Sequence, residues 1–405
     1  MNLGKVLPSI TIERKEGRNY MYFELNEVQQ TIRETARDFA QNYLLPRVDE
    51  IETANLFPQD LINMMAEMGF IGLSYPEKYG GLDLGYLCEA IAIEEIAKVS
   101  PSAAKMLTVC YLPLDAIHLF GTEAQKQKYL PKGISGRNVG SLAFTEAGTG
   151  SDPKQLTTVA KKVGDRYVIN GVKRFISNAA HEGAIVIVAR DEGADTCTAY
   201  IVPKFCKGYS ISTPWDKVGL HGSHVYDVFL DDVEVGEEAV LGNYGNGFNL
   251  LIGTTTYGKL AFSAVFTGAM EGAYDLTVKY INEKMHRGKS IGKFPTVQYK
   301  VAQIASNTMS AQMMLYKAAA EADTIKDDLR KVQAIAALVK GYIADLATST
   351  ITMCVNAHAS YGVTAEYQVE RFMRDAIIFP NIEGSADVQR LIAGGYILRN
   401  SDNLL

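Results

Sequence analysis

The segment TTVAKKVGDRYVINGVKRFIS, residues 157–177, decides the fold class of this chain. It contains short runs rich in β-branched residues, separated by Gly164-Asp165 and Asn170-Gly171. Such dipeptides between strand-like runs predict tight hairpin turns. Three segments of the same character follow: AIVIVAR (184–190), TAYIVPK (198–204) and VYDVFLDDVEV (225–235). We therefore predict a β domain of barrel or sandwich type over residues 138–245.

Helical patterns lie on both sides of this β block. Before it, Leu25, Val28 and Ile32 recur near helical spacing, and Thr122 with Gln125 forms a capping-box pattern. After it, two long helical segments flank the basic loop KMHRGKSIGKF (284–294), and a third helix covers VQAIAALVKGYIADLATSTITMCV (332–355). Because the strands are consecutive, a doubly wound nucleotide fold is disfavoured. The predicted organisation is mainly α with a middle β domain: an extension (1–22), an N-terminal helical domain (23–137), the β domain (138–245) and a C-terminal four-helix bundle (246–405).

The composition excludes several classes of function. The 405 residues carry a net charge of -6, which gives no general attraction to nucleic acid or anionic membranes. No apolar run approaches the roughly 18 residues that span a bilayer, and the first 20 residues lack a secretory pattern. The five scattered cysteines indicate reduced thiols and a cytoplasmic location. We expect residues 1–20 to be a loose extension, or the chain to begin at Met21.

The segment RFMRDAIIFPNIEGSADVQRLI, residues 371–392, carries the strongest chemical signal. Glu383 precedes Gly384 and Ser385 at the expected start of a helix near Ala386. A carboxylate at such a place can face a cleft, and neighbouring backbone N–H groups can polarise a carbonyl. A base beside such donors suits removal of a proton next to a thioester. The alternative interpretation is that Glu383 only caps the helix.

Two further segments are weaker signals. In SLAFTEAGTGSDPKQL (141–156), the glycines around Thr149 allow close approach of the backbone to a flat or phosphorylated ligand. In RFISNAA (174–180), Phe175 offers a ring face, and Ser177 offers a hydroxyl on the same side of a strand. The alternatives are an ordinary turn and a core phenylalanine.

In order and spacing, these pieces resemble the acyl-CoA dehydrogenase family. TEAGTGSD (145–152) matches the family pattern TEPxAGSD, and NGVKRFISNAA (170–180) matches NGxKxWITNG. YINEKMHRGKSIGKFPTVQ (280–298) matches YAxERxQFGKPIxxFQxxQ without gaps. MRDAIIFPNIEGSADVQRLI (373–392) matches MRDAxxxxIYEGTxxIQRxxI. The resemblance extends from about Phe23 to Arg399.

The resemblance implies a flavoenzyme that oxidises acyl-CoA thioesters between the α and β carbons. Glu383 is implied as the α-proton base, with the β-hydride passing to FAD. Residues implied to contact FAD are Phe144, Thr145, Phe175, Ser177 and Ser385. Residues implied on the substrate side are Ser151, which meets the CoA ester, with Tyr257, Lys259 and Gly384. The implied partners are an acyl-CoA, an electron-transfer flavoprotein and identical subunits in a homotetramer or dimer.

The departures from the family cluster where FAD phosphates are expected. A family Arg is Lys284, and the Phe three positions later is Arg287, which can restore the contact. The Gln-x-x-Gly-Gly stretch becomes Asn356-Ala357-His358-Ala359-Ser360. Lysine cannot form the bidentate fork of arginine, and added Cβ atoms restrict close approach. These changes indicate either altered FAD binding or neutral drift in a working subfamily.

On the substrate side, the Arg that marks glutaryl-type members aligns with Ala103. Lys105 lies nearby and is predicted to be solvated, while Thr108 and Tyr111 suggest some polarity around the acyl group. Three alternative functions stay open: an enoyl-CoA reductase working in reverse, a non-redox lyase, and a partner subunit of a hetero-oligomer.

Overall fold

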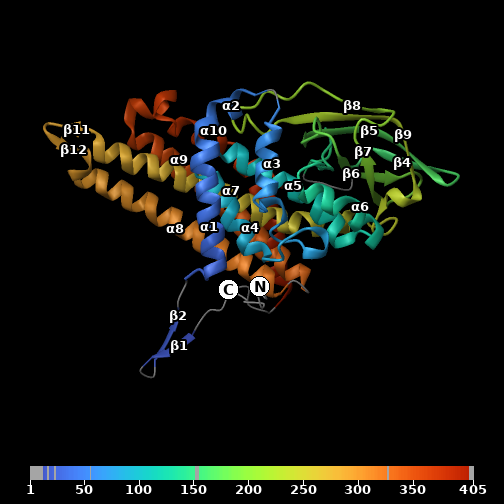
Figure 1. Ribbon diagram of the computed structural model, residues 1–405, viewed down its shortest axis with the longest axis horizontal. Helices are drawn as coiled ribbons and strands as arrows, with labels where there is room; N and C mark the ends of the chain where they lie inside the picture. Colours follow the sequence, from blue (N-terminus) through green and yellow to red (C-terminus); the bar gives the residue numbers. More distant parts are fainter. Residues whose placement is uncertain are drawn as a thin grey trace.

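The computed structural model describes residues 24–400 except 55, 151–154 and 326–327, and also the backbone of two short strands before them. Helices form the centre and one end of the molecule, and the β domain forms the other end (Figure 1). The helices are α1 (Glu27–Phe39), α2 (Val48–Thr53), α3 (Gln59–Glu67), α4 (Gly85–Ala97), α5 (Pro101–Phe120), α6 (Glu123–Ile134), α7 (Gly247–Glu283), α8 (Pro295–Thr324), α9 (Leu329–Ala357), α10 (Val369–Ala376) and α11 (Ala386–Arg399).

Side-chain caps fix the starts of the helices. The predicted capping box at Thr122 is confirmed: its hydroxyl accepts from the amide of Gln125 (3.2 Å), whose side chain accepts from the Thr122 amide. Asn26 forms the same box with Gln29 at α1. Pro101 occupies the first turn of α5 behind the cap Ser100, where its missing N–H costs nothing. Short-range sequence chemistry therefore sets these boundaries.

The middle of the chain forms one eight-stranded sheet. Its order is β10-β7-β6-β4-β5-β9-β8, with β3 paired parallel to β6. The strands are β3 (Ser141–Ala143), β4 (Val159–Val163), β5 (Arg166–Ser177), β6 (Ala184–Asp191), β7 (Cys197–Pro203), β8 (Tyr209–Ile211), β9 (Val225–Gly236) and β10 (Val240–Leu241). Two hairpins stand apart: β1 (Ile12–Lys15) with β2 (Arg18–Met21), and β11 (Met285–His286) with β12 (Lys289–Ser290). The extension, predicted to be loose, thus contains a strand pair.

One of the two predicted hairpin turns is correct. Gly164-Asp165 joins β4 to β5, but Asn170-Gly171 lies inside β5 at a shift in its register with β9. A Cβ on Gly171 would lie 2.6 Å from the Cα of Thr158, and the Asn170 side chain exchanges hydrogen bonds with Asp232. The dipeptide forms a bulge because the backbone of the neighbouring segment packs closely against it.

The helical segments from the two ends of the chain share one hydrophobic core. α4 and α5 pack against α7, and α7, α8, α9 and α11 pack together as the C-terminal bundle. Helix α5 also contacts β3, β6 and β10 of the β domain, which has its own core. α5 and α9 have the length and apolar composition of a membrane span, but most of each window is buried inside the fold. They therefore serve as core helices in this structure.

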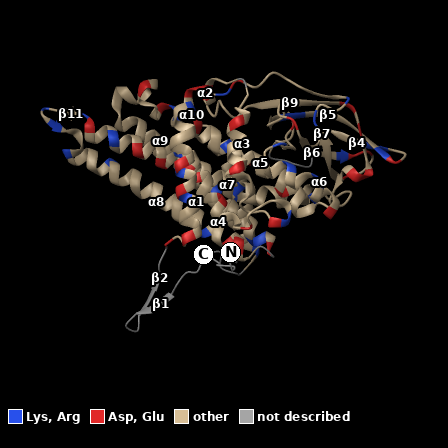
Figure 2. Cartoon of the chain, in the orientation of Figure 1, with Lys and Arg blue, Asp and Glu red and all other residues tan. Residues whose placement is uncertain are grey.

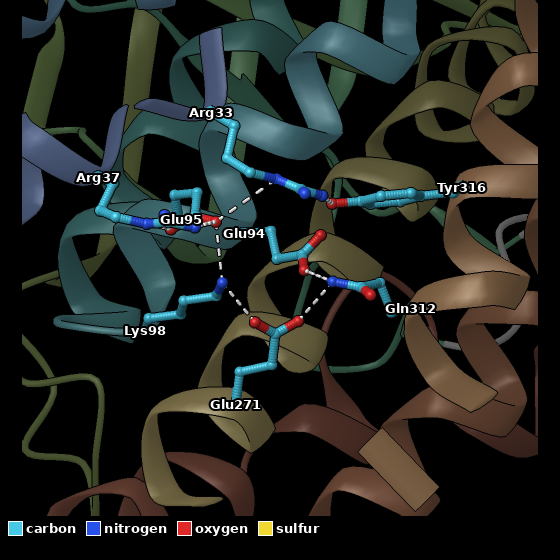
Figure 3. Close-up of polar contacts among 8 residues, drawn as sticks. All are labelled: Arg33, Arg37, Glu94, Glu95, Lys98, Glu271, Gln312 and Tyr316. Carbon is cyan, nitrogen blue, oxygen red and sulfur yellow. Dashed lines mark hydrogen bonds and ion pairs between the residues drawn. The ribbon is translucent and has the colours of Figure 1, made fainter. Parts of the chain in front are cut away.

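A polar network joins four helices within this core (Figure 3). Glu95 on α4 forms a bidentate pair with Arg37 of α1 (3.0 and 3.1 Å), and Lys98 lies 2.8 Å from the same carboxylate. Lys98 also reaches Glu271 of α7, and Gln312 of α8 donates to Glu271 and Glu94. Charges of both signs are intermixed over the rest of the chain, without an extended face of one sign in this view (Figure 2).

Candidate active site

Glu383 lies in a strained connection just before α11. Its backbone has φ 53°, in the left-handed region that non-glycine residues rarely adopt, and Gly384 follows at φ 79°. The helix is capped by Ser385, whose hydroxyl accepts from the amide of Val388 (3.3 Å). The capping interpretation of Glu383 is therefore wrong, because Ser385 performs that role and leaves the glutamate side chain free to point elsewhere.

The Glu383 carboxylate points into the protein without a hydrogen-bond partner. Its Oε1 atom is buried and has no partner among the described residues. It lies against α7 at Gly258, where an added Cβ would be 2.7 Å from Oε1 and 2.7 Å from Leu112 Cδ2 of α5. Burying a polar atom without a hydrogen-bond partner destabilises the fold by about 1–3 kcal/mol, and by more when the group is charged. Such an atom is a strong functional candidate.

Two buried lysines set the electrostatics around this carboxylate. Burial raises the pKa of Glu383, and the positive charges of Lys259 and Lys340 oppose that shift. Burial also lowers the pKa of each lysine to about 8, with Glu383 acting in the opposite direction. Lys259 donates to the Thr255 carbonyl (2.9 Å), and Lys340 donates to the Gly384 carbonyl (2.5 Å). The lysines thus hold the backbone at Thr255 and at Gly384 and oppose the effect of burial on the Glu383 carboxylate.

Further polar groups surround the site on α4, α5 and α7. Burial raises the pKa of Asp115 to about 7; a hydrogen bond from Tyr75 (2.8 Å) opposes this, and the charge of Glu383 adds to it. Tyr257 of α7 stacks on Tyr86, with ring centroids 4.1 Å apart. Asp115 is therefore a polar group close enough to Glu383 for the two charges to interact, whereas the sequence predicted polarity around an acyl group from other residues.

The hydroxyls of Thr108 and Tyr111, predicted to provide that polarity, bond instead to backbone carbonyls. Thr108 donates to Ala104, and Tyr111 donates to Phe70. Hydroxyls satisfied in this way stabilise the helix packing and do not face a ligand as free donors.

The β domain presents a second group of predicted residues. Phe175 has φ 59° and is 52% exposed, so the core interpretation of this residue is wrong. Its ring lies 5.2 Å from that of Trp215. Thr145 is fixed beside it, because its carbonyl accepts from the amide of Arg174 (2.7 Å), and the Phe144 carbonyl accepts from Lys173 (3.1 Å). The result is an exposed aromatic ring on β5, an interior strand of the sheet, at a shift in the register of β5 with β9.

Helix α5 connects this aromatic face with Glu383. Lys105, predicted to be solvated, is only 5% exposed and donates to the Ser177 hydroxyl (3.3 Å). Leu112, seven residues further along α5, lies beside Glu383 through the gap at Gly258. Seven helical residues span about 10 Å. The Ser177 hydroxyl and the Glu383 carboxylate therefore lie near two points of α5 that are about 10 Å apart along the helix axis.

Three family profiles match the chain in order. The acyl-CoA dehydrogenase N-terminal domain matches residues 26–137, the middle domain 141–233 and the C-terminal domain 245–398. The probable acyl-CoA dehydrogenase YngJ of Bacillus subtilis is 33% identical over 94% of this chain and all of its own length. The chain belongs to the acyl-CoA dehydrogenase family. It is an oxidoreductase acting on acyl-CoA.

Other members of the family show the range of similar proteins. The caffeyl-CoA reductase-Etf complex subunit CarC of Acetobacterium woodii is 33% identical, covering 94% of this chain and all of that protein. Butyryl-CoA dehydrogenase from Megasphaera elsdenii superposes with a TM-score of 0.90 at 32% identity, over 94% of this chain and all of that one. Acyl-CoA dehydrogenase complexed with FAD from Bacillus anthracis has a TM-score of 0.88 at 27% identity, over 93% of this chain and 69% of that one.

The remaining predicted site residues of this acyl-CoA dehydrogenase lie elsewhere. Lys284 begins the hairpin loop between α7 and α8, where its amine lies 4.3 Å from the centre of the Tyr361 ring, and Arg287 is at the tip with φ 49°. That hairpin is at the end of the molecule opposite the β domain (Figure 1). Asn356 lines a hollow of about 750 Å³ between α8 and α9. A single chain does not bring these three residues to Glu383. Ser151 lies outside the described residues.

The sequence reasoning missed several residues that shape the site. Gly258, Lys340, Asp115 and Trp215 were not singled out. Lys340 had a usable signal, because it is a lone charge in the apolar run IAALVKGYI and therefore faces the core. Gly258 had none, since a single glycine in a long helix does not say which side chain it makes room for.

The residues present fit a flat flavin ring. An exposed aromatic side chain on a strained backbone, a hydroxyl fixed by a buried lysine and an unpaired carboxylate all lie within reach of one helix. The first two suit a planar heterocycle, and the third suits a carbon acid held beside it.

Proposed function

We propose that this protein is an FAD-dependent dehydrogenase that oxidises an acyl-CoA to its 2-enoyl-CoA, with Glu383 as the base for the α-proton. The observation that carries the proposal is the buried, unpaired Oε1 of Glu383. Its raised pKa gives the carboxylate a greater affinity for the proton of a weak carbon acid than an exposed glutamate has. Its strained backbone and the space at Gly258 hold it in one direction.

The backbone beside Glu383 is suited to polarise the thioester carbonyl. Within the described residues, the amides of Glu383 and Gly384 donate no hydrogen bond. Two free N–H groups next to the base can stabilise negative charge that develops on the thioester oxygen as the α-proton leaves. The amine of Lys340, bonded to the Gly384 carbonyl, keeps this turn in place. We assign Tyr257, Lys259, Gly384 and Ser151 to the substrate side by resemblance to the family.

Phe144, Thr145, Phe175 and Ser177 would hold the isoalloxazine of FAD, and Ser385 would add a hydroxyl contact. The flavin supplies hydride acceptance when bound. The Phe175 and Trp215 rings would cover it from solvent, because both are exposed on the β domain beside α5. Glu383 takes the proton and the residues of the β domain position the acceptor, so the two halves of the reaction are assigned to different domains.

We also propose that the site is completed by a second copy of the chain in a homotetramer or dimer. Lys284, Arg287 and Asn356 would then contact the FAD phosphates of a neighbouring subunit. The outer faces of α8 and α11 support self-association, because they expose large apolar side chains: Tyr299, Met309, Met313, Leu391 and Leu398. Sedimentation analysis should show one species of at least twice the 44.4 kDa chain mass.

We propose an electron-transfer flavoprotein as the electron partner and a cytoplasmic location. Similarity to CarC, a subunit of a reductase-Etf complex, supports the partner. The same similarity favours a second direction of reaction, reduction of an enoyl-CoA, in which protonated Glu383 would return the α-proton. The five cysteines are free, which suits a reducing compartment.

The decisive experiment compares Glu383→Gln with Asp387→Asn, a matched change at an exposed carboxylate four residues away. Glu383→Gln should retain the visible flavin spectrum and lose turnover with short-chain and aryl acyl-CoA esters by about 10²–10⁴-fold. Asp387→Asn should behave as the wild type. A Glu383→Gln protein with unchanged turnover would remove the proposed base, and a colourless wild-type protein that takes up no FAD would remove the flavin.

A further inference from the structure

Lys105 is a buried cation without an anionic partner. Its amine lies 3.0 Å from the Ser223 hydroxyl, 3.4 Å from the Ser223 carbonyl and 3.3 Å from the Ser177 hydroxyl. Among the described residues it forms no ion pair with any carboxylate. Burial of an uncompensated ammonium group is costly, so such a group is retained where something else gains from its charge.

Two buried lysines of the β domain show how unusual this is. Lys173 pairs with Glu146 at 2.7 Å, and Lys204 donates to three backbone carbonyls at 2.6, 2.7 and 3.2 Å. Both have a clear structural role. Lys105 instead contacts two hydroxyls and one carbonyl, and one of the hydroxyls belongs to the face proposed to bind the flavin.

The contact fixes the direction of the Ser177 hydroxyl. The protonated amine of Lys105 only donates, so in that state Ser177 Oγ accepts from Lys105 and its own O–H must point to another acceptor. Within the described part of the chain, that O–H has no protein acceptor. The backbone of Ser177 is held separately, because its carbonyl accepts from the Ser141 hydroxyl at 2.8 Å. The hydroxyl is therefore a pre-oriented donor for a ligand.

We propose that Lys105 is a positioning residue that aims the Ser177 hydroxyl at the bound flavin and places a positive charge beside it, which favours the reduced, more negative state. The inference rests on the proposed function, because it needs FAD at Ser177. It adds a property of this chain: a flavin whose reduction potential is raised from the protein side by a lysine on α5.

The surroundings of Lys105 connect this charge to pH. Burial and, to a smaller extent, the nearby charge of Lys217 together lower the pKa of Lys105 to about 7. His224 also faces this region, and burial lowers its pKa, with Lys217 and Lys105 adding to the effect. His221 and Glu52 lie one step further out, 3.5 Å from each other. Above pH 7, Lys105 is therefore mostly neutral until negative charge appears beside it.

Reduction then takes up one extra proton. The substrate supplies two electrons and one proton as a hydride equivalent, and the added negative charge raises the proton affinity of Lys105. Solvent supplies that second proton to the amine. The expected signature is a steeper fall of the flavin reduction potential with pH above 7 in the wild type than in a variant without the lysine.

The test measures the two-electron reduction potential of FAD-loaded wild type, Lys105→Met and Lys105→Arg against a reference dye, at pH values from 6 to 9. Lys105→Met should shift the ratio of reduced to oxidised flavin at least tenfold toward the oxidised form at pH 6, which is about 30 mV for a two-electron couple. Lys105→Arg should keep most of the wild-type potential. Equal potentials in wild type and Lys105→Met would overturn the proposal.

The wild-type protein provides a second measurement if Lys105→Met does not fold or retain FAD. The steeper slope above pH 7 should be present in the wild type and in His224→Asn, which removes the neighbouring titrating group. A wild-type slope that corresponds to uptake of a single proton would contradict the role of Lys105. Loss of the steeper slope in His224→Asn would contradict it as well. Failure of the proposed function is distinguishable, because it would appear as absent flavin or as full activity in Glu383→Gln.

Discussion

Two buried glutamates in this acyl-CoA dehydrogenase family member have opposite environments. Glu95, in the network of Figure 3, lies among Arg33, Arg37 and Lys98. Burial alone would raise its pKa, but the hydrogen bonds and charges of Arg37 and Lys98 outweigh burial and lower it. The Oε1 atom of Glu383 is also buried, yet it has no hydrogen-bond partner among the described residues, and burial raises the pKa of this carboxyl group.

This difference distinguishes a carboxylate that stabilises the fold from one that is suited to accept a proton. A carboxylate with its charge matched is held ionised, so it stabilises helix packing and accepts protons poorly. A carboxylate left unmatched weakens the fold and accepts protons well. By this criterion, the Glu95 network holds α1 against α4, and Glu383 is available for reaction.

The largest expected effect separates these two properties at Glu383. Glu383→Gln should lower turnover by about 10²–10⁴-fold, which corresponds to roughly 3–5 kcal/mol. Its free energy of unfolding should stay equal or rise, because an unpaired buried acid is removed. Steady-state kinetics and denaturant unfolding of the same preparation check both statements. A large loss of stability would make Glu383 part of the scaffold and break the comparison.

The reverse pattern is expected at Glu95. Glu95→Gln leaves the cationic groups of Arg37 and Lys98 without their counter-charge, so the free energy of unfolding should fall by about 3 kcal/mol. Turnover per folded molecule should change little. Urea unfolding measures the first effect, and activity normalised to bound flavin measures the second. If Glu95→Gln lost turnover at an unchanged free energy of unfolding, Glu95 would belong to the chemistry and not to the packing of the helices.

A smaller effect is expected at Gly258, where α7 and α5 leave space for the Glu383 carboxylate. Gly258→Ala improves helix propensity but places a methyl group 2.7 Å from the Glu383 carboxylate. The displacement should lower kcat/KM about tenfold, within the roughly 1–3 kcal/mol typical of overpacking. Gly394→Ala, at an α11 position where an added Cβ meets nothing within 4 Å, is the matched control. Equal kinetics in both variants would show that the carboxylate moves freely.

The smallest effect concerns pH. Glu383 must be ionised to take a proton, so kcat/KM for dehydrogenation should rise with pH through its raised pKa and then level off. Lys340 lowers that pKa, so Lys340→Met should move the acid limb to higher pH. The plateau should fall as well, because the variant also loses the hydrogen bond to the Gly384 carbonyl. Lys317→Met, at an exposed lysine of α8, should leave the limb in place. An acid limb unmoved by Lys340→Met would show that this charge does not reach the base.

The sequence alone determined the fold class and the identity of the leading candidate. Alternating and β-branched runs at 157–235, capping signals such as Thr122, and the motif around Glu383 are local patterns, and local patterns follow from short-range sterics and hydrogen bonding. The domain limits drawn at 137/138 and 245/246 stay predictions. The sequence also identified Lys284, Arg287 and Asn356 as departures from the family pattern.

Tertiary structure alone decided which of these residues act together. The bulge at Gly171, the exposure of Phe175, the burial of Lys105 and the clearance at Gly258 all depend on segments distant in sequence. No periodic pattern records how close two distant backbones come, or which buried charge lacks a partner. Those quantities arise only when the chain packs, and they distinguish the glutamate that holds this protein together from the one proposed to perform its chemistry.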